Sequence, residues 1–105
     1  MDVIKVEGIE LHVDGDGFLQ DPRLWTESVA VEFAKLDGTG ELGPKHWEVI
    51  RFIRGYWQES DMAPTVRSLC KQCGLKLQEI YSLFPGGPAR GACKIAGLPK
   101  PDGCV

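Results

Sequence analysis

The sequence predicts an α+β fold, in which a small N-terminal antiparallel β-meander packs on an array of about five helices and a mobile C-terminal arm follows. Two observations predict this order. Near the N-terminus, apolar and polar residues alternate with a period of two, which is typical of strands. Further along, apolar residues recur at helical spacing between Gly and Pro residues that end helices. A chain of 105 residues is long enough for one domain with a modest core.

The N-terminal alternation predicts two strands within residues 3–13. Ile9, Leu11 and Val13 are expected on the face that packs on the helices, because side chains alternate across a strand. Gly8 is expected to form the turn between the strands.

A second turn is expected at residues 14–17, where Asp and Gly alternate before the next apolar pair. Such a cluster also suggests a calcium loop. A calcium loop that begins at Asp14 would, however, place Trp25 where the bidentate Glu belongs. The sequence therefore favours a simple turn.

Five helices are expected after the meander, each with recognisable end signals. Thr26 can cap the first, and Pro44 suits the first position of a longer second helix. Apolar residues cover much of the circumference of this second helix, so we expect it to be the central buried helix. The expected helices run from Thr26 to Gly38 or Gly40, from Pro44 to about Ser60, from Ala63–Pro64 to Gly74, from Leu77 to Phe84, and from Gly87–Pro88 to Ala96, with Gly97 as the final stop.

The composition is that of an ordinary globular domain, with 43% hydrophobic and 26% charged residues. The formal net charge of −3 argues against nucleic acid as the main partner. No apolar run approaches the length of a membrane span, and no signal segment opens the sequence. Four cysteines without such a segment favour a reducing compartment. We therefore expect a cytoplasmic protein with chemical rather than structural thiols and no stable nucleic-acid or membrane binding.

The most informative feature is a thiol at the end of a Gly/Pro-rich tail. Cys104 is next to the C-terminus, and Cys93 lies where the tail begins. We expect a globular domain over residues 1–97 and a flexible arm over residues 98–105, because this tail is rich in Gly and Pro and poor in apolar residues. The two thiols can form a mixed disulfide, a persulfide or an internal bridge by thiolate exchange. An exposed thiol is easily oxidised, so a tail that presents one indicates that thiol chemistry is the purpose of the tail. Cys104 and Cys93 are therefore the expected reactive residues.

Cys70 and Cys73 form a second, less specific pair. Both fall late in an expected helix, whereas a thioredoxin-type pair places its attacking thiol at a helix N-terminus. Zinc could recruit this pair with Cys93 and Cys104, or with His46, but the spacing is not that of a standard zinc site. Small buried thiols in a helical core are the favoured interpretation, and no metal or cofactor is expected.

Residues 65–83, with Gly74 at the bend, have the pattern of a helix-turn-helix. The candidate recognition segment, residues 77–82, carries no Arg or Lys for contacts with phosphates. Core packing is therefore the favoured interpretation. A DNA-binding regulator stays an alternative, because Lys76 and other basic residues lie nearby.

Short motifs occur along the whole chain, at residues 25–26 (Trp-Thr), 46–52 (His-Trp-Glu-Val-Ile-Arg-Phe), 63–64 (Ala-Pro), 81–85 (Tyr-Ser-Leu-Phe-Pro), 87–89 (Gly-Pro-Ala), 93–101 (Cys-Lys-Ile-Ala-Gly-Leu-Pro-Lys-Pro) and 103–105 (Gly-Cys-Val). Together they resemble the DsrC/TusE sulfur-carrier family, whose best-known members are called the gamma subunit of dissimilatory sulfite reductase. The C-terminal motif is highly specific. The resemblance implies a small meander sheet on about five helices, with a mobile C-terminal arm.

The resemblance also implies that Cys104 carries sulfur and that Cys93 is the second thiol of the arm. TusE-like members, which feed tRNA thiolation, usually lack the second thiol. They and members from sulfur oxidisers carry a short Lys-Gly-Asn-Ser-containing insertion before the Tyr-containing helix. This chain has Cys93 and runs from Gly74 to Tyr81 without the insertion, so the resemblance favours the sulfite-reductase type.

By this resemblance, the arm inserts into a channel of the alpha and beta subunits of dissimilatory sulfite reductase and brings Cys104 to the sulfur intermediate on the siroheme. Attack by Cys93 gives a trisulfide with Cys104, which a separate electron-donating thiol/disulfide reductase complex reduces. The protein is then a redox-active co-substrate, not an enzyme, and the sequence offers no haem pocket or iron–sulfur spacing of its own. The alternatives are a tRNA-thiolation carrier, which needs only Cys104, and the helix-turn-helix regulator.

Overall fold

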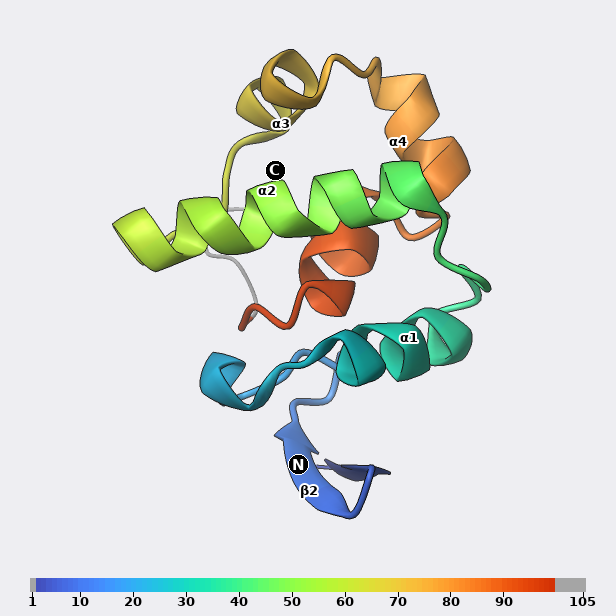
Figure 1. Cartoon of the computed structure of the whole chain (residues 1–105), viewed down its shortest axis with the longest axis vertical. Coiled ribbons are helices and arrows are strands. Elements are labelled where there is room, and N and C mark those ends of the chain that lie inside the picture. Colours follow the sequence, from blue (N-terminus) through green and yellow to red (C-terminus); the bar gives the residue numbers. More distant parts are fainter. Residues whose placement is uncertain (1, 100–105) are drawn as a thin grey trace.

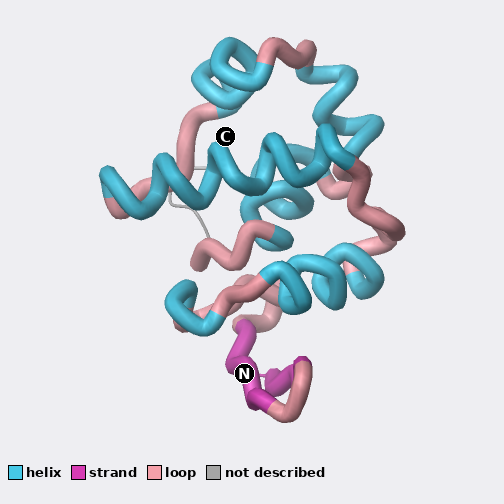
Figure 2. Tube along the Cα trace, in the orientation of Figure 1, coloured by secondary structure: helices cyan, strands magenta, loops and turns pink. Residues whose placement is uncertain are grey.

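The computed structural model describes residues 2–99, and of residues 88–90 only the backbone. Figure 1 shows the sheet at one end, α3 and α4 at the other, and α2 across the middle beside η2 and the residues that follow it. In Figure 2, strands are confined to the N-terminal hairpin and the rest is helices and loops. The expected α+β class is confirmed. The elements are β1 (Asp2–Val6), β2 (Ile9–Val13), η1 (Pro22–Leu24), α1 (Glu27–Leu36), α2 (Pro44–Ser60), α3 (Val66–Cys73), α4 (Leu77–Leu83) and η2 (Pro88–Cys93).

Strands β1 and β2 form an antiparallel hairpin with a two-residue turn at Glu7 and Gly8. Both turn residues have positive φ, +51° and +80°, which matches the twist of the flanking strands. Leu11 and Val13 are buried against the helices as expected, but Ile9 is 47% exposed. The expectation for Ile9 is wrong because this residue lies at the turn end of the hairpin, which projects beyond the helices (Figure 1).

The second expected turn is also present. One carboxylate oxygen of Asp14 accepts hydrogen bonds from the N–H groups of Asp16 and Phe18, at 2.9 and 3.0 Å. Val13 then pairs with Leu19 in an isolated antiparallel bridge. The meander therefore consists of one hairpin and one bridging pair.

Side-chain caps begin α1 and α3. The hydroxyl groups of Thr26 and Thr65 each accept a hydrogen bond from the N–H three residues further on. Helix α3 therefore begins after Thr65, slightly later than the expected start at Ala63–Pro64. Gly74 ends it in the left-handed conformation, at φ +67°, and α4 follows, so the expected helix-turn-helix arrangement is present.

The last two helices differ slightly from their expected extents. Helix α4 ends at Leu83, one residue before Phe84. The helix expected between Gly87–Pro88 and Ala96 is a π-helix up to Cys93, followed by one further helical turn. Insertions of this kind are rare and occur often at functional sites.

Helix α2 has a cap that the sequence did not predict. Gly43 precedes the helix and has no side chain, but its N–H donates to Nδ1 of His46 at 3.0 Å. Because Nδ1 accepts, Nε2 carries the proton and donates to the carbonyl oxygen of Leu83 at 2.8 Å. The ring also packs edge-on against Phe84, with 5.2 Å between the ring centroids. His46 thus joins the start of α2 to the end of α4.

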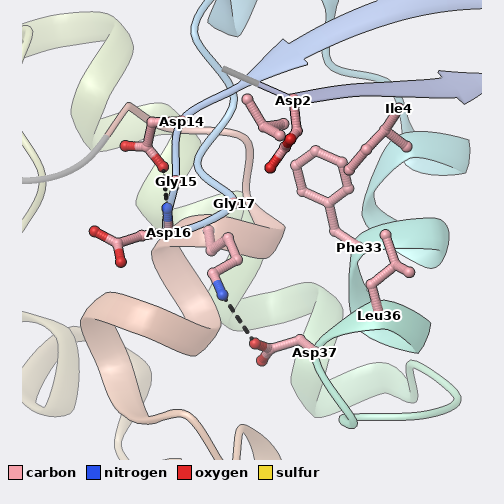
Figure 3. A pocket seen from close by; sticks show the side chains of 11 residues that line it. Asp2, Ile4, Asp14, Gly15, Asp16, Gly17, Phe33, Leu36 and Asp37 are labelled. Atoms are coloured by element: carbon pink, nitrogen blue, oxygen red, sulfur yellow. Dashed lines mark hydrogen bonds and ion pairs between the residues drawn. The ribbon is translucent and has the colours of Figure 1, made fainter.

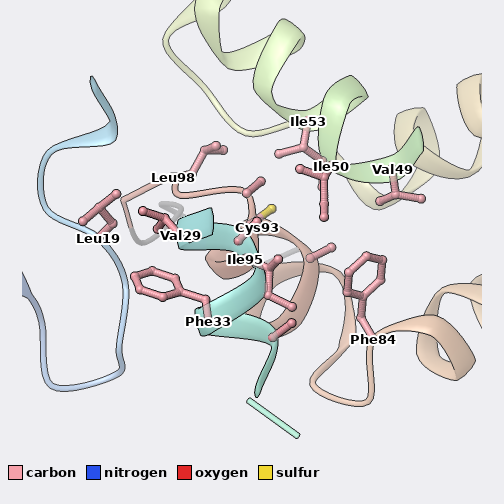
Figure 4. Packing of buried hydrophobic residues seen from close by; sticks show 14 of the residues in the cluster. Leu19, Val29, Phe33, Val49, Ile50, Ile53, Phe84, Cys93, Ile95 and Leu98 are labelled. Atoms are coloured by element: carbon pink, nitrogen blue, oxygen red, sulfur yellow. The ribbon is translucent and has the colours of Figure 1, made fainter. Parts of the chain in front are cut away.

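The core lies between α2, α1 and residues 92–98 (Figure 4). Val49, Ile50 and Ile53 of α2 are fully buried. The large aromatic residues of α2 contact the core but are only partly buried. The helix is therefore central, as expected, but it is buried on one side and not around its circumference. These aromatic residues are Trp47, Phe52 and Trp57.

Replacing His46 tests its role as a cap. His46→Ala should lower the free energy of unfolding by about 1–3 kcal/mol, because two hydrogen bonds and one ring contact are lost. His46→Gln should recover part of this loss, since Gln at this position can accept from the Gly43 N–H. Urea denaturation measures both. Lys45→Ala, at the exposed neighbouring residue, provides the control. If His46→Ala loses no more free energy of unfolding than Lys45→Ala does, the role of His46 as a cap is contradicted.

Candidate functional site

Cys93 ends η2 and is only 2% exposed. Figure 4 shows its sulfur inside the core, close to Ile50 of α2 and to Ile95. Burial raises the pKa of the Cys93 thiol to about 12. Since the thiolate is the nucleophile, Cys93 is almost entirely unreactive at neutral pH in this conformation.

Cys104, the other expected reactive residue, lies outside the described residues. The structure therefore gives no distance between the thiols of Cys93 and Cys104. Leu98, the first residue of the expected arm, is described and is 1% exposed. The globular core thus extends at least to Leu98, and a mobile arm beyond this residue stays a prediction.

Residues 94–98, which we call the C-terminal segment, fold back over Cys93. The N–H of Leu98 donates to the carbonyl oxygen of Cys93 at 3.2 Å, and the N–H of Gly97 donates to that of Lys94 at 3.0 Å. This is the Schellman arrangement at a helix end, and it requires a left-handed residue, here Gly97 at φ +77°. A Cβ atom at Gly97 would also overlap the Trp25 ring. Gly97 is therefore required both by the turn and by the close contact.

Trp25 and Arg54 hold the C-terminal segment from outside. The indole N–H of Trp25 donates to the carbonyl oxygen of Ile95 at 2.9 Å, and Nη1 of Arg54 donates to that of Ala96 at 2.8 Å. The guanidinium group also lies 4.3 Å from the centroid of the Trp25 ring and donates through Nη2 to Pro22 at 3.2 Å. Burial lowers the pKa of Arg54, and the carbonyl groups and the ring face compensate the buried charge.

A half-open pocket lies beside the C-terminal segment (Figure 3). Lys94 crosses it and forms an ion pair with Asp37 at 3.1 Å, with both side chains mostly buried. The turn at residues 14–17 and Phe33 form other parts of the wall. None of the lining residues is a cysteine, so this pocket is separate from the thiol of Cys93.

A family model described as "DsrC like protein" matches residues 5–105. The chain belongs to the DsrC-like family. The gamma subunit of dissimilatory-type sulfite reductase from Nitratidesulfovibrio vulgaris is 42% identical over 102 residues, which cover 97% of each chain. Sulfurtransferase TusE from Escherichia coli (strain K12) is 42% identical over 106 residues, which cover 94% of this chain and 96% of TusE. The solved structure of the oxidized gamma subunit (DsrC) of dissimilatory sulfite reductase from Archaeoglobus fulgidus superposes with a TM-score of 0.91 at 45% identity, covering 99% of this chain and 100% of that one.

The remaining two cysteines of this DsrC-like chain lie on α3. Cys73 is 7% exposed and contributes to the core, and burial raises the pKa of its thiol. Cys70 is only half-buried, so the expectation of two buried thiols is wrong for it. The buried face of α3 is the one that carries Leu69 and Cys73, and Cys70 lies beside this face, partly toward solvent. Among residues 2–99, no three His, Cys, Asp or Glu side chains are placed to hold a metal ion.

The residues that hold the C-terminal segment of the DsrC-like chain were not identified from the sequence. In the sequence, Trp25 stands out only as part of a short motif, and no motif includes Arg54. A signal existed for Arg54, since it interrupts the apolar side of a helix that carries Ile50 and Ile53. None of the described helices is long and apolar enough to cross a membrane.

The buried Cys93 thiol should make the stability of the DsrC-like protein fall at high pH. Between the ordinary pKa of 9.0 and the folded value of about 12, the unfolded chain loses a proton that the folded chain keeps. The free energy of unfolding should therefore fall with rising pH by about 1.4 kcal/mol per unit more in the wild type than in Cys93→Ala. Urea denaturation between about pH 9.5 and about pH 11 measures this difference.

Cys93→Val provides the control, because it fills the site differently but also removes the titrating thiol. In both variants, the free energy of unfolding should fall less steeply with pH than in the wild type, and by the same amount, whatever their stability at neutral pH. Cys73 contributes equally to all three proteins. Equal slopes in the wild type and in both variants would contradict the burial of the Cys93 thiol.

Proposed function

We propose that this protein is a sulfur carrier and co-substrate of dissimilatory sulfite reductase, with Cys104 as the residue that takes up sulfur and Cys93 as its partner in a trisulfide. The observation that carries the proposal is the match to a gamma subunit of this reductase over 97% of both chains, in a chain that has both thiols. The alpha and beta subunits of the reductase are the proposed partners, and the arm is proposed to enter them near the siroheme.

The proposed reaction takes up electrons and protons in two stages. One sulfite and two thiols give a trisulfide and three waters, with the uptake of two electrons and four protons supplied at the reductase. Reduction of the trisulfide to hydrogen sulfide and two thiols takes up four electrons and four protons, from a separate thiol/disulfide reductase complex. The protein returns to its starting state only with this second partner, so it acts as a co-substrate and not as an enzyme by itself.

A sulfur relay to tRNA is the second candidate, and the relatives named sulfurtransferase TusE support a role in sulfur transfer. The lengths of the alignments favour the first. The alignment with the gamma subunit has 102 positions and covers 97% of this chain, so it is nearly free of gaps. The alignment with TusE has 106 positions but covers only 94% of this chain, so TusE contains residues that this chain lacks. This difference agrees with the expected absence of an insertion.

Serine variants of the two arm cysteines test the division of roles. After turnover with the reductase, sulfite and reductant, the wild type should gain about 30 Da, for one sulfur added and two hydrogens lost. Cys93→Ser should gain about 32 Da, because a persulfide forms on Cys104 without a bridge. Cys104→Ser should gain nothing. Intact-mass spectrometry measures all three.

Two outcomes would contradict the proposal. A bridged species in Cys93→Ser would identify Cys70 or Cys73 as the partner thiol instead. Full function of Cys93→Ser in delivering sulfur to tRNA, without any product from the sulfite reductase, would favour the TusE-like role.

A further inference from the structure

Cys93 cannot take part in a bridge from the position that the structure gives it. The core encloses its side chain, and the C-terminal segment folds back onto its carbonyl group through the N–H of Leu98. Leu98 is itself 1% exposed. Any reaction of Cys93 with a second thiol therefore requires part of the packing around it to open, and residues 95–98 are the part of that packing that follows Cys93 directly in the chain.

Hydrogen bonds to two carbonyl groups oppose this movement. The carbonyl groups of Ile95 and Ala96 lie in the last helical turn, where the helix itself offers them no donor. Trp25 and Arg54 donate to one each, and the cation is also favourably placed at a helix C-terminus. The two acceptors belong to consecutive residues of one turn, so opening the segment breaks both bonds. The guanidinium group also stacks on the Trp25 ring, so each donor helps to position the other.

The ion pair of Lys94 defines where the movement begins. Lys94 is held by Asp37 on the side of the pocket, and its Nζ also lies 5.7 Å from the centroid of the Phe18 ring, directly after the turn at residues 14–17. Residues up to Lys94 are thus fixed to α1 and to the N-terminal turn. Residues 95–98 have no such ion pair and are held by Trp25 and Arg54 and by the burial of their own side chains, so the segment opens after Lys94.

We propose that Trp25 and Arg54 are positioning residues that control the access of Cys93 to chemistry by holding residues 95–98 closed. In the closed state Cys93 is protected from random oxidation and from premature bridging. In the open state it is available to the sulfur on Cys104. What the opened thiol attacks rests on the proposed function, whereas the opening itself does not.

The expected effect follows from the type of bond. A hydrogen bond from a charged donor stabilises a folded structure enough that its loss should raise the open population about tenfold or more. Arg54→Gln removes the charge and the stacking. Trp25→Phe keeps a ring for Arg54 and removes only the indole donor, so it should act in the same direction with a smaller effect.

Alkylation of the full-length protein by N-ethylmaleimide measures the opening. Trypsin places the four cysteines on four different peptides, residues 68–71, 72–76, 91–94 and 95–105, so one digest gives four separate rates. In Arg54→Gln, Cys93 should react about tenfold faster or more than in the wild type. Cys73, which is buried in another part of the core, should keep its wild-type rate and serves as the internal reference.

Three further proteins separate positioning from general stability. Arg51→Gln removes an exposed arginine of the same helix, whose Nη2 lies 3.7 Å from Glu27 Oε2 in a surface ion pair. Because such pairs contribute little to stability, this variant should leave the Cys93 rate unchanged. Arg54→Lys should restore part of the protection, because an ammonium group can still donate to Ala96. Gly97→Ala should raise the Cys93 rate, since its Cβ would overlap the Trp25 ring.

The indole N–H of Trp25 gives a second readout, by hydrogen exchange in NMR. In Arg54→Gln its exchange should become faster, while the amides of Ile50 and Ile53 keep their protection. The proposal is overturned if Arg54→Gln accelerates Cys93 no more than Arg51→Gln does. It is also overturned if Cys73 and the α2 amides accelerate by the same factor, since the variant would then act by unfolding the whole domain.

The same labelling distinguishes this inference from the proposed function. It needs no reductase and no sulfite. Faster alkylation of Cys93 in the variants, together with no sulfur uptake by the wild type from the reductase, would support the control of access and contradict the sulfur-carrier role. Sulfur uptake without any effect of the variants on Cys93 would do the reverse.

Discussion

The carbonyl groups of Ile95 and Ala96 accept hydrogen bonds from Trp25 and Arg54, and this contact joins parts of the chain that are far apart in sequence. The turn that it stabilises brings Leu98 into the core and encloses Cys93. Arg54 also bonds to Pro22, so the same guanidinium group fixes the loop that leads into α1. If the contact is lost, the C-terminal segment loses its outer wall and the core loses its cover on that side.

This arrangement gives the C-terminal segment two functions that oppose each other. As part of the core, it must stay packed, and burial then holds the Cys93 thiol in its protonated form. In the proposed function it is also the start of a sulfur-carrying arm, and in that role it releases the thiol for a reaction. Hydrogen bonds at the surface of the segment solve this conflict, because they can break without unfolding the central helix α2. The side chains of Ile95, Ala96 and Leu98 are buried, so opening also exposes apolar surface, and the population of the open state is set by these contacts together with the hydrogen bonds.

Local signals predicted most of the fold. Pro44, Thr26 and Gly74 begin or end helices for reasons that depend only on neighbouring residues, and the alternation in β2 placed Leu11 and Val13 correctly. The site was predicted only in part, because its contacts join distant residues. Trp25 and Ile95 are 70 positions apart, and no local pattern indicates that they meet. The cap from His46 was missed because histidine is an unusual partner for a glycine at a helix start. Burial of Cys93 follows from its neighbours in space and not from the tail motif that drew attention to it.

The central claim is that Cys93 becomes reactive by local opening of residues 95–98. The most direct measurement compares two rates in the same wild-type sample: amide hydrogen exchange of Gly97 and Leu98, and alkylation of Cys93. Each rate gives a free energy of opening when it is divided by the rate of the unprotected group. The account predicts that the two free energies agree and are lower than those of the α2 amides of Ile50 and Ile53. A free energy from Cys93 alkylation that equals the value for global unfolding, while Gly97 and Leu98 exchange faster, would contradict it.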